Sequence, residues 1–232
     1  IEAIESFAAD VAHELRNPLT SLRSAVETLP VAKTEQSRQR LLAVIEHDVK
    51  RLDRLISDIS DASRLDAELQ RQEAAPIDLA KLLDALVKAA NEVRADDVKV
   101  TLTFEGSPLS EFKIAGHDSR IGQVVSNLVD NARSFSPAGG TVRITCRRLR
   151  GEVEILVDDE SQGIRPEALD KIFERFYTDR PEQGFGQNSG LGLSISKQIV
   201  EAHGGTVRVE NRMGGQPSRV LGARFVVRLP AS

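Results

Sequence analysis

Apolar residues in the first part of the chain recur at steps of three and four, which is the spacing of one stripe along an α-helix. One stripe lies before Pro30. A second follows a helix-start signal at Thr34 and continues to about Leu65. The pattern predicts two long helices, whose stripes are Phe7, Val11, Leu15, Leu19, Leu22, Val26 and Leu29, then Leu41, Ile45, Val49, Leu52, Ile56 and Ile59.

Each of these helices carries a single apolar stripe, so an isolated antiparallel pair would leave much of both stripes in water. Dimerisation into a four-helix bundle would bury them. The pattern therefore favours a homodimer built on a helical hairpin. The alternative is a hairpin that packs on the rest of its own chain.

The pattern of apolar and polar residues changes after a polar stretch at 67–76. This stretch is typical of a linker, here between a first domain, 1–66, and a second, 77–232. Short alternating segments typical of strands now lie between helical ones. The fold class expected is therefore two-domain, α plus α/β, with helices layered on one mostly antiparallel sheet. Helices are predicted at 78–87, 119–135 and 193–203, and strands at 98–104, 141–146, 153–157, 206–210 and 223–229.

Composition narrows the class of protein further. A net charge of −4 argues against a nucleic-acid partner, which normally requires a basic excess. The single cysteine, Cys146, excludes an internal disulfide framework. No apolar run approaches the roughly 18 residues that span a bilayer, so we expect this chain to be soluble. It starts at Ile1 inside a helical pattern, so we expect a fragment whose membrane-bound sensory region lies outside it.

One histidine in the first predicted helix stands out. His13 lies roughly 165° from the centre of the apolar stripe, at about 100° per residue. Glu14 is its neighbour, and Asn17 shares its face one turn on. An exposed imidazole beside a carboxylate is a candidate nucleophile. Most histidines on polar faces have no such role, and His47 also lies opposite its own stripe, so periodicity alone leaves both readings open.

Two segments of the second domain carry further candidate chemistry. Asn127 and Asn131 lie one turn apart on a helix, and their amide oxygens suit a hard cation such as Mg²⁺. Asp159 follows a strand, with Gly163 four residues on. A buried carboxylate could accept a hydrogen bond from an exocyclic amine, and a glycine lets the backbone approach a flat ring. Solvated asparagines and an ordinary strand-end turn are the alternatives.

A third segment, from Gly184 to Gly192, is a glycine-rich loop that runs directly into a helix. Its free backbone N–H groups and the helix N-terminus favour phosphate oxygens. It is neither a Walker A loop nor a dinucleotide fingerprint, because the required lysine and third glycine are absent. The alternative, a flexible linker, does not explain the tight Gly190-Leu-Gly192 at the helix start.

Taken together, these motifs resemble the cytoplasmic core of a two-component sensor histidine kinase. The boxes occur in that family's order over nearly the whole chain. They are His13-Glu-Leu-Arg-Asn-Pro18, Asn127-Leu-Val-Asp-Asn131-Ala, Asp159-Glu-Ser-Gln-Gly163-Ile, Phe173-Glu-Arg-Phe176 and Ser189-Gly-Leu-Gly-Leu-Ser-Ile195. The local run from Arg175 to Pro181 is similar to the ChvG-like subfamily.

This resemblance implies a dimerising hairpin followed by a GHKL or Bergerat-type α/β sandwich. It implies that His13 attacks the γ-phosphate of ATP, that Glu14 accepts its proton or orients the ring, and that Asn17 aligns water for dephosphorylation of the partner. That partner would be the receiver domain of a response regulator, which takes the phosphoryl group on an aspartate. The chain would be the cytoplasmic portion of a bacterial inner-membrane receptor.

The resemblance also implies an ATP site with bound Mg²⁺. Asn131, with Asn127, would hold the metal on the triphosphate, while Asp159 would bind the adenine amine. Phe173 and Phe176 would begin a mobile lid. The residues expected around the nucleotide are Asn127, Asn131, Asp159, Gly163, Ile164, Phe176, Gly190, Leu191 and Gly192.

Three positions depart from the family pattern. Ser161 stands where a glycine is usual, Asn188 replaces the first glycine of the lid, and Ser134 replaces a basic residue, with Arg133 one position early. If position 161 needs a positive φ, a serine there would strain the backbone. The alternative function is therefore a catalytically impaired or phosphatase-biased ATP-binding scaffold. A chaperone- or topoisomerase-type ATPase is less compatible with His13 and Glu14 on a hairpin.

Overall fold

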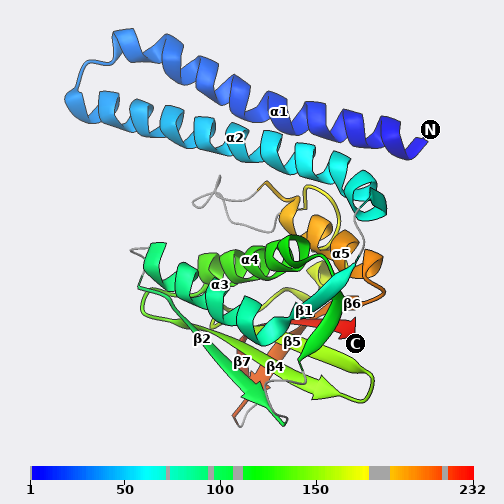
Figure 1. Cartoon of the computed structure of the whole chain (residues 1–232). Helices are drawn as coiled ribbons and strands as arrows, with labels where there is room; N and C mark the ends of the chain where they lie inside the picture. The colour runs from blue at the N-terminus through cyan, green and yellow to red at the C-terminus, as the bar shows by residue number, and fades with distance from the viewer. Residues whose placement is uncertain (1, 72–73, 94–96, 107–111, 178–188, 216–218) are drawn as a thin grey trace. The chain divides into compact units, whose positions relative to one another are not determined.

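The computed structural model describes residues 2–71, 74–93, 97–106, 112–177, 189–215 and 219–232 (Figure 1). It divides into two compact units. One contains Ile1–Arg64 and Glu174–Gly192, and the other contains Leu65–Phe173 and Leu193–Ser232. The segment 174–192, which the sequence assigned to the second domain, thus clusters with the first unit.

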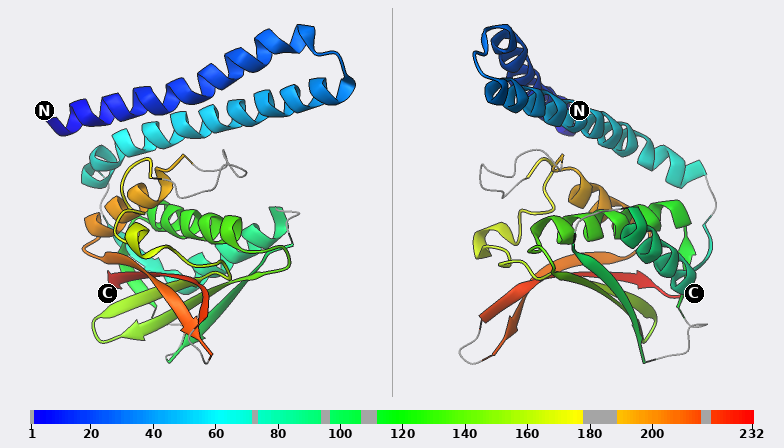
Figure 2. Two further views of the ribbon diagram at one scale, coloured as in Figure 1. Left: turned by 180° about the vertical axis from the view of Figure 1, so that it is seen from behind. Right: turned by 90° about the vertical axis from the view of Figure 1, so that its left-hand side faces the viewer.

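Two long helices dominate the first unit, α1 (Glu2–Thr28) and α2 (Glu35–Arg71), joined through a short 3₁₀ turn, Leu29–Val31. They lie antiparallel and side by side (Figures 1 and 2). Thr34 caps α2, because its Oγ1 accepts the backbone N–H of Ser37 at 3.1 Å. The predicted hairpin is confirmed.

The end of α2 differs from the sequence prediction. The helix continues to Arg71 and strand β1 begins at Ala75, so most of the predicted linker at 67–76 is regular structure. Glu68, Leu69, Gln70 and Arg71 are all good helix formers, and no proline or glycine interrupts them. The polar composition of this segment is also typical of a linker, so the sequence pattern alone does not separate the two.

The second unit is one layer of helices on a five-stranded sheet of order β2-β4-β5-β7-β6 (Figures 1 and 2). Only β2 and β4 are parallel; the other pairs in this sheet are antiparallel. The predicted sandwich is confirmed. Its elements are β1 (Ala75–Asp78), α3 (Leu79–Val93), β2 (Lys99–Glu105), β3 (Lys113–Gly116), α4 (Asp118–Phe135), β4 (Thr141–Leu149), β5 (Glu152–Asp158), a 3₁₀ turn (Pro166–Ala168), α5 (Gly192–Ala202), β6 (Thr206–Gly214) and β7 (Arg219–Pro230).

The core of this unit forms where buried strand residues meet the apolar faces of α4 and α5. Strand β5 is central and is buried along nearly all of its length. Burial of such side chains stabilises the fold by about 1.5–3 kcal/mol each. The core side chains include Ile144, Ile155, Val157, Phe225 and Val227 from the strands, and Ile121, Val125, Leu128, Ile195 and Ile199 from the helices.

His203 connects the start of α4 with the end of α5 through hydrogen bonds. The backbone N–H of His117 donates to Nε2 of His203 at 3.1 Å, and Nδ1 of His203 lies 2.7 Å from the carbonyl oxygen of Ile199. His203 must therefore be neutral, with its proton on Nδ1, for both bonds to form. Burial lowers the pKa of His203, and the charge of nearby His117 lowers it further.

This geometry predicts that the second unit loses stability as the pH falls. Because the folded pKa of His203 lies below the ordinary value of 6.5, the unfolded chain binds its proton first, and the stability present above pH 6.5 declines below it. We expect His203→Gln to remove that component. The check is the free energy of unfolding in urea at pH 5.5 and 7.5, with His47→Gln as the matched control. An equal pH dependence in wild type and His203→Gln would contradict the assignment.

Candidate functional site

Asp159 lies at the centre of the candidate nucleotide site, directly after β5, and only 2% of it is exposed. Its Oδ1 accepts two backbone N–H groups, from Ala223 at 2.7 Å and Ser161 at 2.9 Å. Its own N–H donates to the carbonyl of Ala223 at 3.0 Å. The carboxylate is therefore held rigidly against β7, as a recognition group requires.

Gly222 on β7 makes this close approach possible. A Cβ at position 222 would lie 2.1 Å from the carbonyl oxygen of Asp159 and 2.8 Å from its Oδ1. The φ of Gly222 is +143°, a conformation that side-chain-bearing residues rarely adopt. Sequence reasoning missed this residue, because the approach joins two strands that are far apart in the chain.

Gly163 and Ile164 form the next part of the site. Gly163 has a φ of +81°, and a Cβ there would lie 2.4 Å from Val220 Cγ1. The amide of Asn211, on β6, clamps the backbone of Ile164: its Oδ1 accepts the N–H at 2.8 Å and its Nδ2 donates to the carbonyl at 2.7 Å. The requirement for glycine at 163 is thus geometric. Asn211 was also missed, since nothing in its local sequence marks it.

Ser161 sits in this turn without the strain that a positive φ would bring. Among the described residues, Phe176 is the one non-glycine residue with a positive φ, so Ser161 does not need a left-handed backbone. Its Oγ accepts the N–H of Gly163 at 3.0 Å. The hydroxyl therefore supports the turn, and the backbone argument for an impaired site loses its basis.

We expect Ser161→Gly to destabilise the second unit by about 1 kcal/mol, because the hydrogen bond to Gly163 is lost and the unfolded chain gains freedom. Nucleotide affinity should not improve. Urea unfolding and an ATP titration check this, with Ser161→Ala as the control that removes the hydroxyl but keeps Cβ. A several-fold gain in affinity or activity for Ser161→Gly would contradict it.

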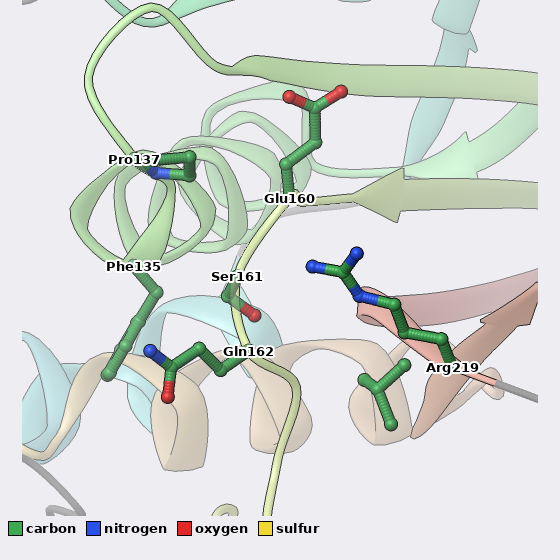
Figure 3. Close-up of a pocket in the computed structure, with 7 residues that line it drawn as sticks. Phe135, Pro137, Glu160, Ser161, Gln162 and Arg219 are labelled. Atoms are coloured by element: carbon green, nitrogen blue, oxygen red, sulfur yellow. The ribbon is translucent and has the colours of Figure 1, made fainter.

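A pocket of about 530 Å³ opens beside Ser161 (Figure 3). Phe135 and Pro137, at and just after the end of α4, lie on one side, and Arg219 of β7 lies on another, with Glu160 and Gln162 beside Ser161. Val220 of β7 also lines the pocket. Phe135 is 41% exposed. An exposed ring at a pocket wall suits stacking on a planar group.

Phe135 was not among the predicted site residues, although a signal existed. It lies four positions after Asn131 and therefore on the same face of α4.

The two asparagines of α4 are each half-buried. Nδ2 of Asn127 donates to Oγ of Ser196 on α5 at 3.3 Å. No cluster of three His, Cys, Asp or Glu side chains suitable for a metal exists in the described part of the chain. A divalent ion at this place would therefore be coordinated by amide oxygens of the protein and by oxygens of a bound substrate. Two amides one turn apart fit a hard cation that retains waters.

Arg133 does not replace the basic residue expected at position 134. It is only 4% exposed, and its Nη1 donates to the carbonyl oxygen of Ala90 on α3 at 2.6 Å. It therefore stabilises the packing of α3 on α4. Ser134 is exposed, and its Oγ donates to the carbonyl of Asn131 at 2.7 Å.

The predicted lid falls partly outside the described residues, which leave out 178–188 and so Gly184, Gly186 and Asn188. Of the described part, Phe173 belongs to the second unit, where its ring meets Phe225 edge-on at 6.4 Å. Phe176, Gly190, Leu191 and Gly192 belong to the first unit.

Phe176 and Gly190 depend on each other. The N–H of Phe176 donates to the carbonyl of Gly190 at 2.9 Å, and a Cβ on Gly190 would lie 2.7 Å from Phe176 Cα. Leu191 is buried, and its N–H donates to Oγ of Ser189 at 3.1 Å. Close backbone contact explains the need for glycine at 190.

The hairpin presents His13 as the pattern predicts. His13 and Asn17 are exposed one turn apart on α1, while Pro18 is buried inside the same helix. Glu14 is only 22% exposed at its side chain, and its Oε2 lies 3.1 Å from Nη2 of Arg51 on α2. The neighbouring carboxylate is therefore engaged across the hairpin. Sequence reasoning missed Arg51, whose partner is 37 residues away.

Comparison with known families identifies both units. Residues 3–68 match the His Kinase A phospho-acceptor domain, and residues 116–232 match the histidine kinase-, DNA gyrase B-, and HSP90-like ATPase family. No helix in the described residues has the length and apolar character needed to cross a bilayer.

Proteins that match this chain over nearly its whole length agree with this assignment. The chain is 58% identical to the sensor protein ChvG of Rhizobium meliloti, over 100% of this chain and 41% of that protein. The chain therefore spans about two fifths of this curated relative. It is 26% identical to a structure of full-length ShkA in complex with AMPPNP, over 97% of this chain and 45% of that one, with a TM-score of 0.61.

The structure of the histidine kinase ThkA in complex with the response regulator protein TrrA has the same fold, with a TM-score of 0.73 at 24% identity. The match covers 98% of this chain and 61% of the ThkA chain. The two family matches and the identity to ChvG place the chain in the sensor histidine kinase family, as a ChvG-like kinase core.

Proposed function

We propose that this chain phosphorylates itself on His13 with Mg-ATP and passes the phosphoryl group to an aspartate of a response regulator. The observation that carries the proposal is the exposed His13, on the polar face of α1, inside the part of the chain that matches the phospho-acceptor family. The ATPase-family match of the second unit supplies the nucleotide class.

In the proposed reaction, a lone-pair nitrogen of neutral His13 attacks the γ-phosphorus. The bond from that phosphorus to the bridging oxygen breaks, and ADP leaves with the electron pair. The proton on the other imidazole nitrogen then passes to the carboxylate of Glu14. Most of the catalysis is positioning and charge neutralisation, because phosphoryl transfer leaves little covalent work for the protein.

Asp159 is the proposed adenine anchor. Its Oδ1 is held by two backbone N–H groups, so the carboxylate has a fixed direction in which to accept the exocyclic amine. Gly163 and Ile164 would let the ring approach the backbone, and Phe135 would stack on it. Gly190, Leu191 and Gly192 would face the phosphates through the helix N-terminus.

Magnesium, when bound, would neutralise charge on the β- and γ-phosphate oxygens. Asn131 and Asn127 are the residues we propose to hold it, through amide oxygens on one face of α4. Asn17, one turn after His13, is proposed to align the water that removes the phosphoryl group from the regulator.

We propose that the chain acts as a homodimer. Several large apolar side chains on the hairpin remain exposed in the single chain: Leu19, Val26, Leu42, Val44, Val49 and Ile56 are each 40–56% exposed. Two such surfaces would bury one another in a four-helix bundle. By analogy with the ChvG relatives, the chain would work as the cytoplasmic part of a membrane receptor.

The test is incubation with γ-labelled ATP and Mg²⁺, followed by acid and alkali treatment. Label that is acid-labile and alkali-stable supports a phosphohistidine. ATP binding without label would favour the impaired or phosphatase-biased scaffold, and absence of nucleotide binding would refute both.

A further inference from the structure

The hairpin contains two buried charged atoms that have no partner. Oδ2 of Asp48 and Nε of Arg51 are fully covered, and neither makes a hydrogen bond within the described residues. Asp48 as a whole is 5% exposed. Unsatisfied buried polar atoms are rare and costly, and those on charged groups more so. Such a pair calls for a physical explanation.

In each of these two side chains another polar atom has a partner, and the atom named above does not. One oxygen of Asp48, Oδ1, lies 3.3 Å from Nδ1 of His47, which leaves Oδ2. Arg51 donates through Nη2 to Glu14 on α1, which leaves Nε. Asp48 and Arg51 are three residues apart on α2, so their side chains share one helix face. Arg51 therefore has two carboxylates within its range, one on each helix.

We propose that Arg51 exchanges between Glu14 and Asp48 and thereby sets whether Glu14 is available to His13. With Arg51 on Glu14, as in this structure, the carboxylate beside the phosphoacceptor is occupied. With Arg51 on Asp48, both orphaned atoms gain a partner and Glu14 is released. Arg51 is thus a positioning residue that acts through Glu14. The proposal rests on the proposed function for two roles, that of His13 as acceptor and that of Glu14 as its base.

Exchange of this kind predicts opposite effects from two substitutions. Asp48→Asn removes the charge of the second acceptor, so Arg51 stays with Glu14. If the two acceptors are equally populated in the wild type and the substitution shifts the equilibrium about tenfold, the rate of His13 phosphorylation falls about fivefold. Arg51→Met releases Glu14 permanently and raises the rate, by about twofold if the two acceptors are equally populated. Methionine keeps the apolar packing of the arginine stem.

A merely structural role would not give this pattern. Asp48→Asn weakens the contact with His47, and Arg51→Met leaves the carboxylates of Glu14 and Asp48 without a cation, so simple destabilisation would lower the rate in both. The double variant Asp48→Asn/Arg51→Met removes both charges and should behave like Arg51→Met. In a Glu14→Gln background, neither substitution should change the rate further. The KM for ATP should stay the same throughout, because Arg51 is not part of the nucleotide site.

The experiment measures the initial rate of labelling of the whole chain, with urea unfolding and sedimentation as checks of folding and dimerisation. A second readout needs no ATP: the rate at which diethyl pyrocarbonate modifies His13, followed by mass spectrometry, with His117 as internal control. A hydrogen bond from the imidazole to Glu14 makes the ring more nucleophilic, so modification should be faster in Arg51→Met and slower in Asp48→Asn.

Parallel losses in both variants, persistence of their effects in the Glu14→Gln background, or a weakened dimer in Asp48→Asn alone would overturn the proposal. The last result would mean that a second copy satisfies Asp48. If no chain is labelled by ATP but the modification rates of His13 still move in opposite directions, the exchange stands and the proposed kinase reaction fails.

Discussion

His13→Gln removes covalent labelling of this chain by γ-labelled ATP completely. Glutamine has a similar reach but no nitrogen lone pair that can attack phosphorus, so the phosphoramidate has nowhere to form. The side chain is exposed, so the substitution leaves no cavity and should change the free energy of unfolding by less than about 0.5 kcal/mol. ATP affinity of the second unit should be unchanged, since the residues proposed to hold adenine lie in that unit.

His47→Gln is the matched control for this result. His47 lies on the facing helix of the same hairpin and is partly exposed, with 37% of its side chain accessible. It should retain most of the labelling. Residual label in His13→Gln that is stable to acid would point to a different acceptor residue and refute the proposed site. Normal labelling of His13→Gln together with its loss in His47→Gln would exchange the two assignments.

Gly222→Ala should abolish nucleotide binding and destabilise the second unit by about 3 kcal/mol. The new Cβ would lie 2.1 Å from the carbonyl oxygen of Asp159, and both residues are buried, so their backbones have little room to move. Relief of this overlap must separate β7 from the segment after β5, which breaks the bonds between Asp159 and Ala223. A loss of only about 1.4 kcal/mol in binding is already tenfold in affinity.

Gly106→Ala separates this clash from backbone strain. Gly106 also has a positive φ, +86°, but no described atom lies within 4 Å of its would-be Cβ. It should cost about 1 kcal/mol and leave ATP affinity unchanged. Urea unfolding and an ATP titration of both variants check the pair. If Gly222→Ala binds ATP like Gly106→Ala, the close approach at Asp159 is not what holds the carboxylate.

Local patterns in the chain were enough for much of the fold. The apolar stripes predicted both long helices, and period-two alternation located the five strands of the main sheet, because these features depend on neighbours in sequence. The short strands β1 and β3, at four residues each, were not predicted, since so few positions cannot establish a period. The predicted end of α2 was too early, because a polar helical segment and a linker have similar composition.

The candidate site divides along the same line. His13, Asn131, Asp159 and Gly163 carry chemistry in residue types and spacings that are readable from the chain, and the order of the motifs along the chain is enough to indicate the family. Whether Ser161 is compatible with that family's turn cannot be read in this way. The structure shows that Ser161 fits the turn, because its φ is not positive and its Oγ accepts the N–H of Gly163. Backbone conformation depends on the whole turn and on its neighbours, so the sequence alone does not give it.

Contacts between residues that are far apart in the chain are visible only in the tertiary structure. Gly222 against Asp159, Asn211 on Ile164, His203 at the start of α4, and Arg51 between Glu14 and Asp48 join positions that no periodicity connects. Periodic patterns report which face of an element is buried, since burial repeats with the geometry of the backbone. They contain no information on which side chain of another element will be met there, because packing and hydrogen-bond geometry are selected only when the elements assemble.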